Sequence, residues 1–349
     1  MKKLCALATM LALGSYVAAA PDDNLRTEAE RSGYQRTGRY PEVEKLCQAF
    51  RQKWPDWVAC EQFGVTPEGR PMWAMVVSRS GALSPEQARA RDIPVLLMQG
   101  GIHSGEIDGK DAGFLALRQM LLDQAAPQAL EKCVVVFVPV FNIDGHERFG
   151  RWNRPNQVGP EEMGWRTTAQ NLNLNRDYAK ADAPEMRSML ALLNRWDPIL
   201  YADLHVTDGA QFQHDIANLV EPIFMGEPTL RPLALALQND VNEKLKAQGS
   251  LPLSFYPSPR DHNNPASGFA QSAYPPRFST GYWALRNRLA ILVETHSWKD
   301  YPWRVKSTKN LIVALAENTA RQGRRWREVA HQADQACSSL DGRPLSLTY

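Results

Sequence analysis

Short apolar runs alternate with longer segments of helical periodicity over most of the chain. Brief apolar runs between polar or proline-bearing segments are typical of strands, whereas apolar positions three or four apart indicate a helix with one buried face. Strands are therefore predicted at 58–65, 71–77, 95–98, 134–140 and 289–293, with a further strand that ends at His205. Helices are predicted at 40–54, 108–123, 183–196, 230–248 and 311–327. This alternation predicts one α/β domain whose sheet is covered by helices on both faces.

Segments without a clear period separate these elements. The polar segment 84–91 is predicted to be a loop, as are the long stretches 146–170 and 251–278, which contain many Gly, Pro, Asn and Ser residues. Loops this long in compact domains are often functional. The sequence shows no internal repeat, low-complexity tract or linker, so a second domain is not expected.

The first residues of the chain have the layout of a secretory signal peptide. Lys2 and Lys3 precede an apolar stretch that ends in three alanines, which predicts a signal segment at 1–19 and a periplasmic or secreted protein. The apolar run falls short of the roughly 20 residues that span a bilayer. The predicted catalytic domain is then 20–335, followed by a C-terminal extension at 336–349.

Composition and charge exclude several classes of partner. The 349 residues are 44% hydrophobic and 22% charged, which is ordinary for a soluble globular protein. Without Lys2 and Lys3, the 40 basic residues fall to 38 and equal the 38 acidic residues. No basic excess then favours nucleic acid or a membrane surface as a partner.

Four of the five cysteines lie outside the signal segment. Cys47, Cys60, Cys133 and Cys337 could form two disulfides in an oxidising compartment, with three connectivities open, or remain free buried thiols. None lies beside the polar residues that end the predicted strands. A cysteine nucleophile or a thiolate zinc site is therefore disfavoured.

Three predicted strands lead to side chains with metal-binding or acid–base chemistry. The run 95–98 continues through two glycines to His103 and Glu106, and two later runs lead directly to His205 and Glu294. Because the carboxyl ends of strands in open α/β sheets converge on one crevice, these four side chains are predicted to share a site.

Two imidazoles and one carboxylate form a common ligand set for catalytic Zn²⁺. They leave one coordination position open for water or a substrate carbonyl. The metal lowers the pKa of such a water and polarises the carbonyl. Glu294 is then the candidate general base, able to pass a proton from the water to a leaving amine. A buried salt bridge at the strand end is the alternative role for Glu294.

A second informative run, Asn-Leu-Asn-Leu-Asn-Arg-Asp-Tyr, lies at 171–178. A guanidinium beside an amide is well suited to holding a carboxylate. Together with the His-x-x-Glu pair, the strand-end His and Glu, and Asn-Ile-Asp-Gly at 142–145, this order resembles the zinc carboxypeptidase (M14) family. The segment Gly-Arg-Pro-Met-Trp-Ala at 69–74 also looks like the opening strands of that family. The resemblance covers residues 40–298.

The resemblance implies a zinc carboxypeptidase-like fold with a mixed, mostly parallel central sheet. It implies a metallopeptidase that hydrolyses C-terminal peptide bonds through a zinc-activated water. One zinc ion would be held by His103, Glu106 and His205, with Glu294 as the general base. The partner would be a peptide with a free C-terminal carboxylate.

The resemblance also implies a set of substrate contacts. These contacts would be made by Asn175, Arg176, Arg166, Arg154 and Tyr274. The Asn-Arg pair would hold the substrate carboxylate, and Arg166 is the first choice for the arginine that stabilises the oxyanion, with Arg154 as the alternative. Tyr274 would cover the bound substrate, with Tyr282 as the alternative.

Two positions depart from the family pattern. Gly105 stands where digestive-type members carry an arginine beside the ligand Glu, and Asn173 stands where many members carry an aspartate that orients the first zinc histidine. An amide is a weaker partner for a ligand histidine than a carboxylate. Asp203 shares a strand face with His205, although a role as a ligand bridging two metals is disfavoured. These departures indicate a divergent branch of the family.

Two other functions remain open at this point. The first is a zinc-dependent deacylase or amidase on the same scaffold, acting on N-acyl amino acids or cell-wall peptides. The second is an inactive peptide-binding homologue. The presence of Glu294 disfavours the inactive homologue, because a protein that only binds has no need of a general base.

Overall fold

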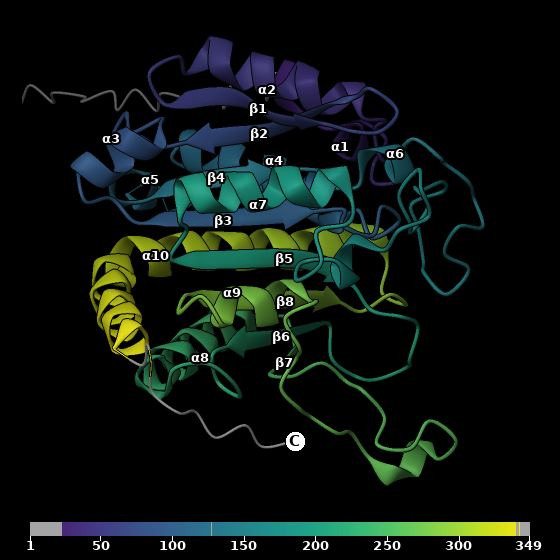
Figure 1. Ribbon diagram of the computed structural model, residues 1–349. Helices are drawn as coiled ribbons and strands as arrows, with labels where there is room; N and C mark the ends of the chain where they lie inside the picture. Colours follow the sequence, from purple (N-terminus) through teal and green to yellow (C-terminus); the bar gives the residue numbers. More distant parts are fainter. Residues whose placement is uncertain (1–22, 127, 340–341, 343–349) are drawn as a thin grey trace, which may run out of the picture.

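A mixed sheet of eight strands, in the order β1-β2-β4-β3-β5-β8-β6-β7, runs through the middle of the molecule (Figure 1). The structure is a computed structural model and describes residues 23–126, 128–339 and 342. The predicted signal segment at 1–19 lies outside these described residues. The strands in sheet order are β1 (Val58–Val65), β2 (Pro71–Val77), β4 (Val134–Val138), β3 (Val95–Gly100), β5 (Leu200–Val206), β8 (Leu289–Thr295), β6 (Ile216–Glu221) and β7 (Pro252–Leu253).

The four central strands β4, β3, β5 and β8 are parallel neighbours. Strand β2 is antiparallel to β4 and β1 is antiparallel to β2, while β6 is antiparallel to β8 and parallel to β7. Every residue of the four central strands is buried, which explains why their sequences read as almost continuous apolar runs. The structure thus confirms the predicted α/β domain with a mixed, mostly parallel sheet.

Helices cover both faces of this sheet. The longer ones are α2 (Pro41–Lys53), α4 (Asp108–Leu121), α7 (Pro184–Trp196), α8 (Arg231–Ala247) and α10 (Tyr301–Ser338). The shorter ones are α1 (Glu28–Arg31), α3 (Pro85–Ala90), α5 (Ala129–Lys132), α6 (Ile143–His146) and α9 (Ser279–Ala284). In Figure 1, α7 and α9 lie in front of the sheet and α10 lies behind it, where it packs against α4. Among the described residues, no helix combines the length and apolarity needed to cross a membrane.

Several elements differ from their predicted bounds. The segment 84–91 contains α3, because the Ser84 side chain accepts a hydrogen bond from Gln87 N and Pro85 occupies the first turn. Helix α10 begins ten residues before the predicted start at 311, since its polar first turns are buried against the domain, with Arg304 paired to Asp108. It also continues to Ser338, so the first residues of the predicted extension at 336–349 are helical.

Strand β6 and helix α9 were not predicted. Strand β6 is only six residues long and lies between His214-Asp215 and Pro222, so its apolar signal is short and flanked by polar residues. Helix α9 follows the long segment 251–278 and contains Gly281, which lowers its helical signal. Both elements flank β8 and so help to shape the edge of the sheet near Glu294.

One disulfide is formed among the described residues. It joins Cys47 in α2 to Cys60 in β1, with 6.0 Å between their Cα atoms. Cys133 is a buried free thiol and Cys337 is an exposed one. Of the connectivities that the sequence leaves open, the structure therefore has the Cys47–Cys60 bond and no bond between the other two cysteines.

Candidate metal centre and active site

The turn after β3 brings His103 and Glu106 beside the end of β5. Gly101 has a φ of +61°, and a Cβ atom at Gly100 would lie 2.7 Å from the carbonyl oxygen of Pro139. Glycine is required at Gly101 for the left-handed backbone and at Gly100 for the close approach to Pro139. The backbone N–H of Glu106 donates to the carbonyl of His103 at 2.9 Å, which closes the turn.

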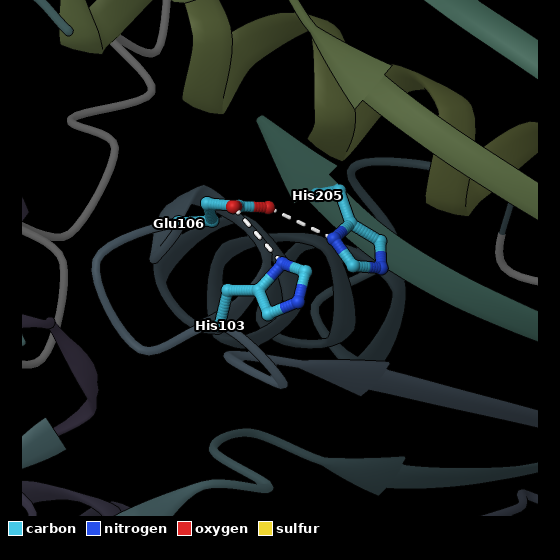
Figure 2. A group of neighbouring side chains, drawn as sticks. All are labelled: His103, Glu106 and His205. Atoms are coloured by element: carbon cyan, nitrogen blue, oxygen red, sulfur yellow. Dashed lines mark hydrogen bonds and ion pairs between the residues drawn. The ribbon is translucent and has the colours of Figure 1, made fainter. Parts of the chain in front are cut away.

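The side chains of His103, Glu106 and His205 converge in a buried group (Figure 2). The Nδ1 atom of His103 lies 3.0 Å from Glu106 Oε1, and the Nδ1 atom of His205 lies 2.8 Å from Glu106 Oε2. One ligand atom from each of the three residues lies within 4.8 Å of the others. This is the arrangement that the strand-end pattern predicts, although the three residues are up to about a hundred positions apart in the chain.

The donor set fits Zn²⁺. Two imidazole nitrogens and one carboxylate oxygen face a common point, while the outer Nε2 nitrogen of each histidine is hydrogen-bonded elsewhere. Fixing the outer nitrogen sets the ring orientation and leaves the inner nitrogen for the metal. These three residues are therefore the ones that could hold the ion, with a position left open for water or substrate.

The two histidines have different outer partners. His103 Nε2 lies 3.1 Å from the amide oxygen of Asn173, whereas His205 Nε2 lies 2.9 Å from the carboxylate of Asp203. Asp203 in turn accepts hydrogen bonds from Gln99 and Ser279. Asp203 therefore acts on the outer nitrogen of His205.

The charge of Glu106 is balanced by Arg154 and the two histidines. Burial alone would raise the pKa of Glu106, but Arg154 and the two histidines outweigh it and hold the pKa well below the usual range. Burial likewise opposes protonation of His205, yet the carboxylates of Asp203 and Glu106 hold its pKa well above the ordinary value. Glu106 is thus an anionic ligand, and a dication entering the centre would displace the proton from His205.

Glu294 lies on β8 directly opposite His205 in the strand register. The residue is 8% exposed, and its Oε2 atom has no hydrogen-bond partner among the described residues. Burial, together with the charges of Glu106 and Asp208, raises its pKa well above the usual value. Glu294 forms no ion pair with any residue that the structure describes, so the salt-bridge alternative gains no support from these residues.

A cavity of about 200 Å³ opens beside this centre. Its lining includes the predicted residues Arg166, Asn175, Arg176 and Tyr274, together with His103, Glu106 and Glu294. Arg154 and Tyr282 do not line it. Arg154 is buried behind Glu106, and Tyr282 packs its ring against Tyr178 at 5.8 Å between centroids. The cavity is therefore lined by Arg166 and not by its alternative Arg154, and by Tyr274 and not by its alternative Tyr282.

Arg176 is a cation that faces the cavity without a carboxylate partner among the described residues. Its Nη1 donates to the carbonyl of Asn175 at 2.6 Å, and its guanidinium lies 4.3 Å from the centre of the Phe278 ring. Burial, with Arg166 and Arg277 nearby, lowers its pKa. A partly buried cation of this kind is stabilised by an anionic ligand.

Comparison with known protein families identifies the scaffold. The sequence model of the zinc carboxypeptidase family, Peptidase_M14, matches residues 43–218, half of the chain. The chain belongs to the zinc carboxypeptidase family. This family is zinc-dependent, and the matched region contains all three residues of the candidate metal centre.

Solved carboxypeptidase structures share this fold at low sequence identity. A metallo-carboxypeptidase from Pseudomonas aeruginosa, in complex with (2-guanidinoethylmercapto)succinic acid, has a TM-score of 0.57 at 17% identity, covering 79% of this chain and 68% of that one. A metallo-carboxypeptidase from Burkholderia cenocepacia has a TM-score of 0.56 at 14% identity, covering 79% and 68%. Carboxypeptidase A from Helicoverpa armigera has a TM-score of 0.54 at 16% identity, covering 86% and 74%. A comparison with curated proteins gave no significant match.

Within this zinc carboxypeptidase fold, sequence analysis missed several cavity residues, of which two are polar partners of each other. Tyr256 and Asp208 both line the cavity, and the Tyr256 hydroxyl donates to Asp208 Oδ2 at 3.2 Å. Asp208 follows His205 by three residues, so its place after a strand end was a usable signal. Tyr256 lies inside the segment 251–278, where no periodic pattern marks any residue.

Proposed function

We propose that this chain is a zinc metallocarboxypeptidase that removes C-terminal residues from peptides, with Glu294 as the general base. The observation that carries the proposal is that Glu294 and Arg176, neither of which has an ion-pair partner among the described residues, line the same cavity as the candidate metal ligands His103 and Glu106. One cavity thus contains a candidate general base and a cation that can bind an anion. This combination suits a substrate that has a carboxylate next to its scissile bond.

One Zn²⁺ held by His103, Glu106 and His205 would supply polarisation of the scissile carbonyl and a lowered pKa for the attacking water. The free Glu294 oxygen takes the proton from this water and delivers it to the leaving amine. Because Glu294 is only 8% exposed, the proton that it carries between the two steps is shielded from bulk water.

The arginines and the amide position the substrate. Arg176 and Asn175, which both line the cavity, bind the C-terminal carboxylate, and Tyr274 covers it. Arg166 is 34% exposed and lines the cavity beside Glu106, so it stabilises the negative charge that develops on the carbonyl oxygen.

The proposed compartment is the periplasm or the extracellular medium. It is supported by the signal-like composition of the first residues and by the Cys47–Cys60 disulfide, since such bonds persist in oxidising compartments. Detection of the protein in a periplasmic extract or culture medium tests this part of the proposal. Retention of the full-length chain in the cytosol would contradict it.

The activity is tested by metal analysis together with peptide hydrolysis. Purified protein is expected to contain about one zinc per chain and to release C-terminal residues stepwise from unblocked peptides, as read by mass spectrometry. Peptides with an amidated C-terminus should be poor substrates. Acyl release from N-acyl amino acids without cleavage of longer peptides would favour the deacylase, and zinc binding without any hydrolysis would favour the inactive homologue.

A further inference from the structure

The space beside Glu106 that a side chain at position 105 would occupy is filled from elsewhere in the chain. A Cβ atom on Gly105 would lie 2.7 Å from Cδ and 3.0 Å from Cγ of Arg154, and 2.9 Å from the carbonyl oxygen of Gly164. The φ of Gly105 is not in the left-handed region, so glycine is needed there for space and not for backbone conformation. Any larger residue at 105 would displace the Arg154 side chain.

Arg154 uses this space to join two parts of the metal centre. Its Nη1 donates to Glu106 Oε1 at 2.5 Å, and its Nη2 donates to the carbonyls of Val206 and Thr207 at 3.2 and 2.9 Å. These two carbonyls directly follow His205. One planar guanidinium therefore connects the ligand carboxylate after β3 to the backbone that carries the ligand histidine at the end of β5.

The segment that carries Arg154 is itself fixed to the same turn. The Gln157 side chain donates to the carbonyl of Gly105 at 3.0 Å and to the carbonyl of Gly159 at 3.0 Å. Arg154 is only 7% exposed. The guanidinium is thus held in place before any metal or substrate binds, as a supporting residue must be.

Arg166 offers an internal comparison, because it contacts the same oxygen from the same loop. Its Nη1 lies 3.1 Å from Glu106 Oε1, but its side chain is 34% exposed, lines the cavity and also lies 3.9 Å from Asp208. Arg166 can turn toward a substrate, whereas the Nη1 and Nη2 donors of Arg154 are committed to Glu106 and to the carbonyls of Val206 and Thr207. The two arginines are therefore placed for different roles.

We infer that Arg154 is a positioning residue that orients Glu106 for the metal, and that Gly105 is present because Arg154 occupies the space of its missing side chain. The inference rests on the proposed zinc site but not on peptide hydrolysis. It gives the departure at Gly105 a physical reason: an arginine is supplied to this side of Glu106 from the loop at 146–170 and acts on the ligand instead of the substrate.

The test is zinc affinity, measured on the full mature protein by competition with a chromophoric chelator. Arg154→Met removes the charge and the hydrogen bonds but keeps much of the side-chain volume, and it is expected to weaken zinc binding about 10- to 100-fold, the usual cost of losing a group that supports a ligand. Arg154→Lys keeps the charge without the planar fork, and should recover only part of the loss. Thermal unfolding of the metal-free proteins verifies that each variant is folded.

Arg166→Met is the matched control. It should leave zinc affinity within about threefold of the wild type while lowering kcat/KM, because Arg166 acts on the substrate. Equal losses of zinc affinity in the two variants would overturn the inference, as would unchanged or tighter zinc binding by Arg154→Met. The wild-type protein could also bind zinc normally, and Arg154→Met bind it more weakly as expected, while neither cleaves any peptide. That outcome would refute the proposed function but leave this inference standing.

A double-mutant cycle tests the link to Gly105. Gly105→Ala should also weaken zinc binding, since its methyl group must push Arg154 away from Glu106. Combined with Arg154→Ala, which removes the Arg154 contacts but not the contact with the Gly164 carbonyl, it should cost less than the sum of the two single changes. Strictly additive losses would show that Gly105 and Arg154 act independently and would overturn the second half of the inference.

Discussion

Strand ends supply one wall of the cavity and long loops supply the other, and the walls differ in how firmly their side chains are held. The strand wall consists of the lining residues His103, Glu106 and Glu294, together with His205, which contacts Glu106. All four lie at or just after the ends of β3, β5 and β8, and all are buried. The loop wall consists of Arg166, Arg176, Tyr256 and Tyr274, each only partly buried.

The difference follows from how each wall is built. Three neighbouring parallel strands fix the strand wall through continuous backbone hydrogen bonds, with His205 and Glu294 directly paired in register. The loop wall depends on individual side-chain contacts, such as Tyr256 to Asp208 and Arg176 over the Phe278 ring. The comparison suggests that the strand wall sets the chemistry and the loop wall sets which substrate is held.

The sharpest separation of chemistry from binding is expected at Glu294. Glu294→Gln keeps the size of the side chain but removes the base, so kcat should fall by about 10²–10⁴-fold, the usual contribution of a general base. Zinc content and KM should change little, because Glu294 is not among the grouped ligands. Stopped assays with metal analysis provide the measurement, and turnover near the wild-type rate would exclude Glu294 as the base.

On the loop wall, the largest effect is expected from Arg176. Arg176→Met should lower kcat/KM by about 30- to 1000-fold, corresponding to about 2–4 kcal/mol for a lost charged hydrogen-bond partner. An amidated peptide provides the control, because it has no carboxylate for Arg176 to bind and should be cleaved equally poorly by wild type and variant. An equal loss on free and amidated peptides would mean that Arg176 does not bind the substrate carboxylate.

The support of the two ligand histidines can be compared by substituting the residues that contact their Nε2 atoms, Asp203 for His205 and Asn173 for His103. Asp203→Asn should weaken zinc binding about 10- to 100-fold, because it removes the carboxylate that orients His205. Asn173→Asp supplies a carboxylate to His103 and should strengthen binding by a smaller factor. Chelator competition measures both. If the two variants gave equal zinc affinity, the unequal support of the two histidines would have no consequence for the metal.

The strand wall could be predicted from the sequence because its signal is local. An apolar run identifies a buried strand, and the first polar residues after it lie at the strand end whatever the rest of the chain does. His103, Glu106, His205 and Glu294 each follow such a run, so their convergence required only the rule that parallel strand ends meet. The family resemblance then supplied roles that spacing alone does not.

The loop wall was less predictable because tertiary contacts decide its shape. Arg154 and Arg166 lie in one polar segment that is rich in arginine, and nothing local distinguishes the buried one from the one facing the cavity. Their difference depends on Gln157, which fixes the loop to the carbonyl of Gly105. Tyr256 is placed by its contact with Asp208, almost fifty residues away in the chain. Contacts of this range leave no periodic signal.

His146 makes the segment 146–170, which carries the loop-wall residue Arg166, sensitive to acid. It ends α6 at the start of the segment 146–170, its Nε2 lies 3.1 Å from the carbonyl of Gly38, and Gly164 packs closely against its Cα. Burial, and then the charge of Lys110, lowers the pKa of His146 to about 3. The unfolded chain, with an ordinary histidine pKa near 6.5, therefore binds the proton more readily than the folded protein between about pH 6.5 and pH 3.

Stability should accordingly fall as the pH drops through this window. The loss attributable to His146 is close to zero at pH 7.5 and about 2 kcal/mol at pH 5. Urea unfolding of the metal-free protein at these two pH values measures it, with His146→Gln as the control because glutamine does not titrate. The variant should be less stable at pH 7.5 but should lose less stability on acidification. If wild type and variant lost the same stability between pH 7.5 and pH 5, other groups would have to account for the acid sensitivity of the loop wall.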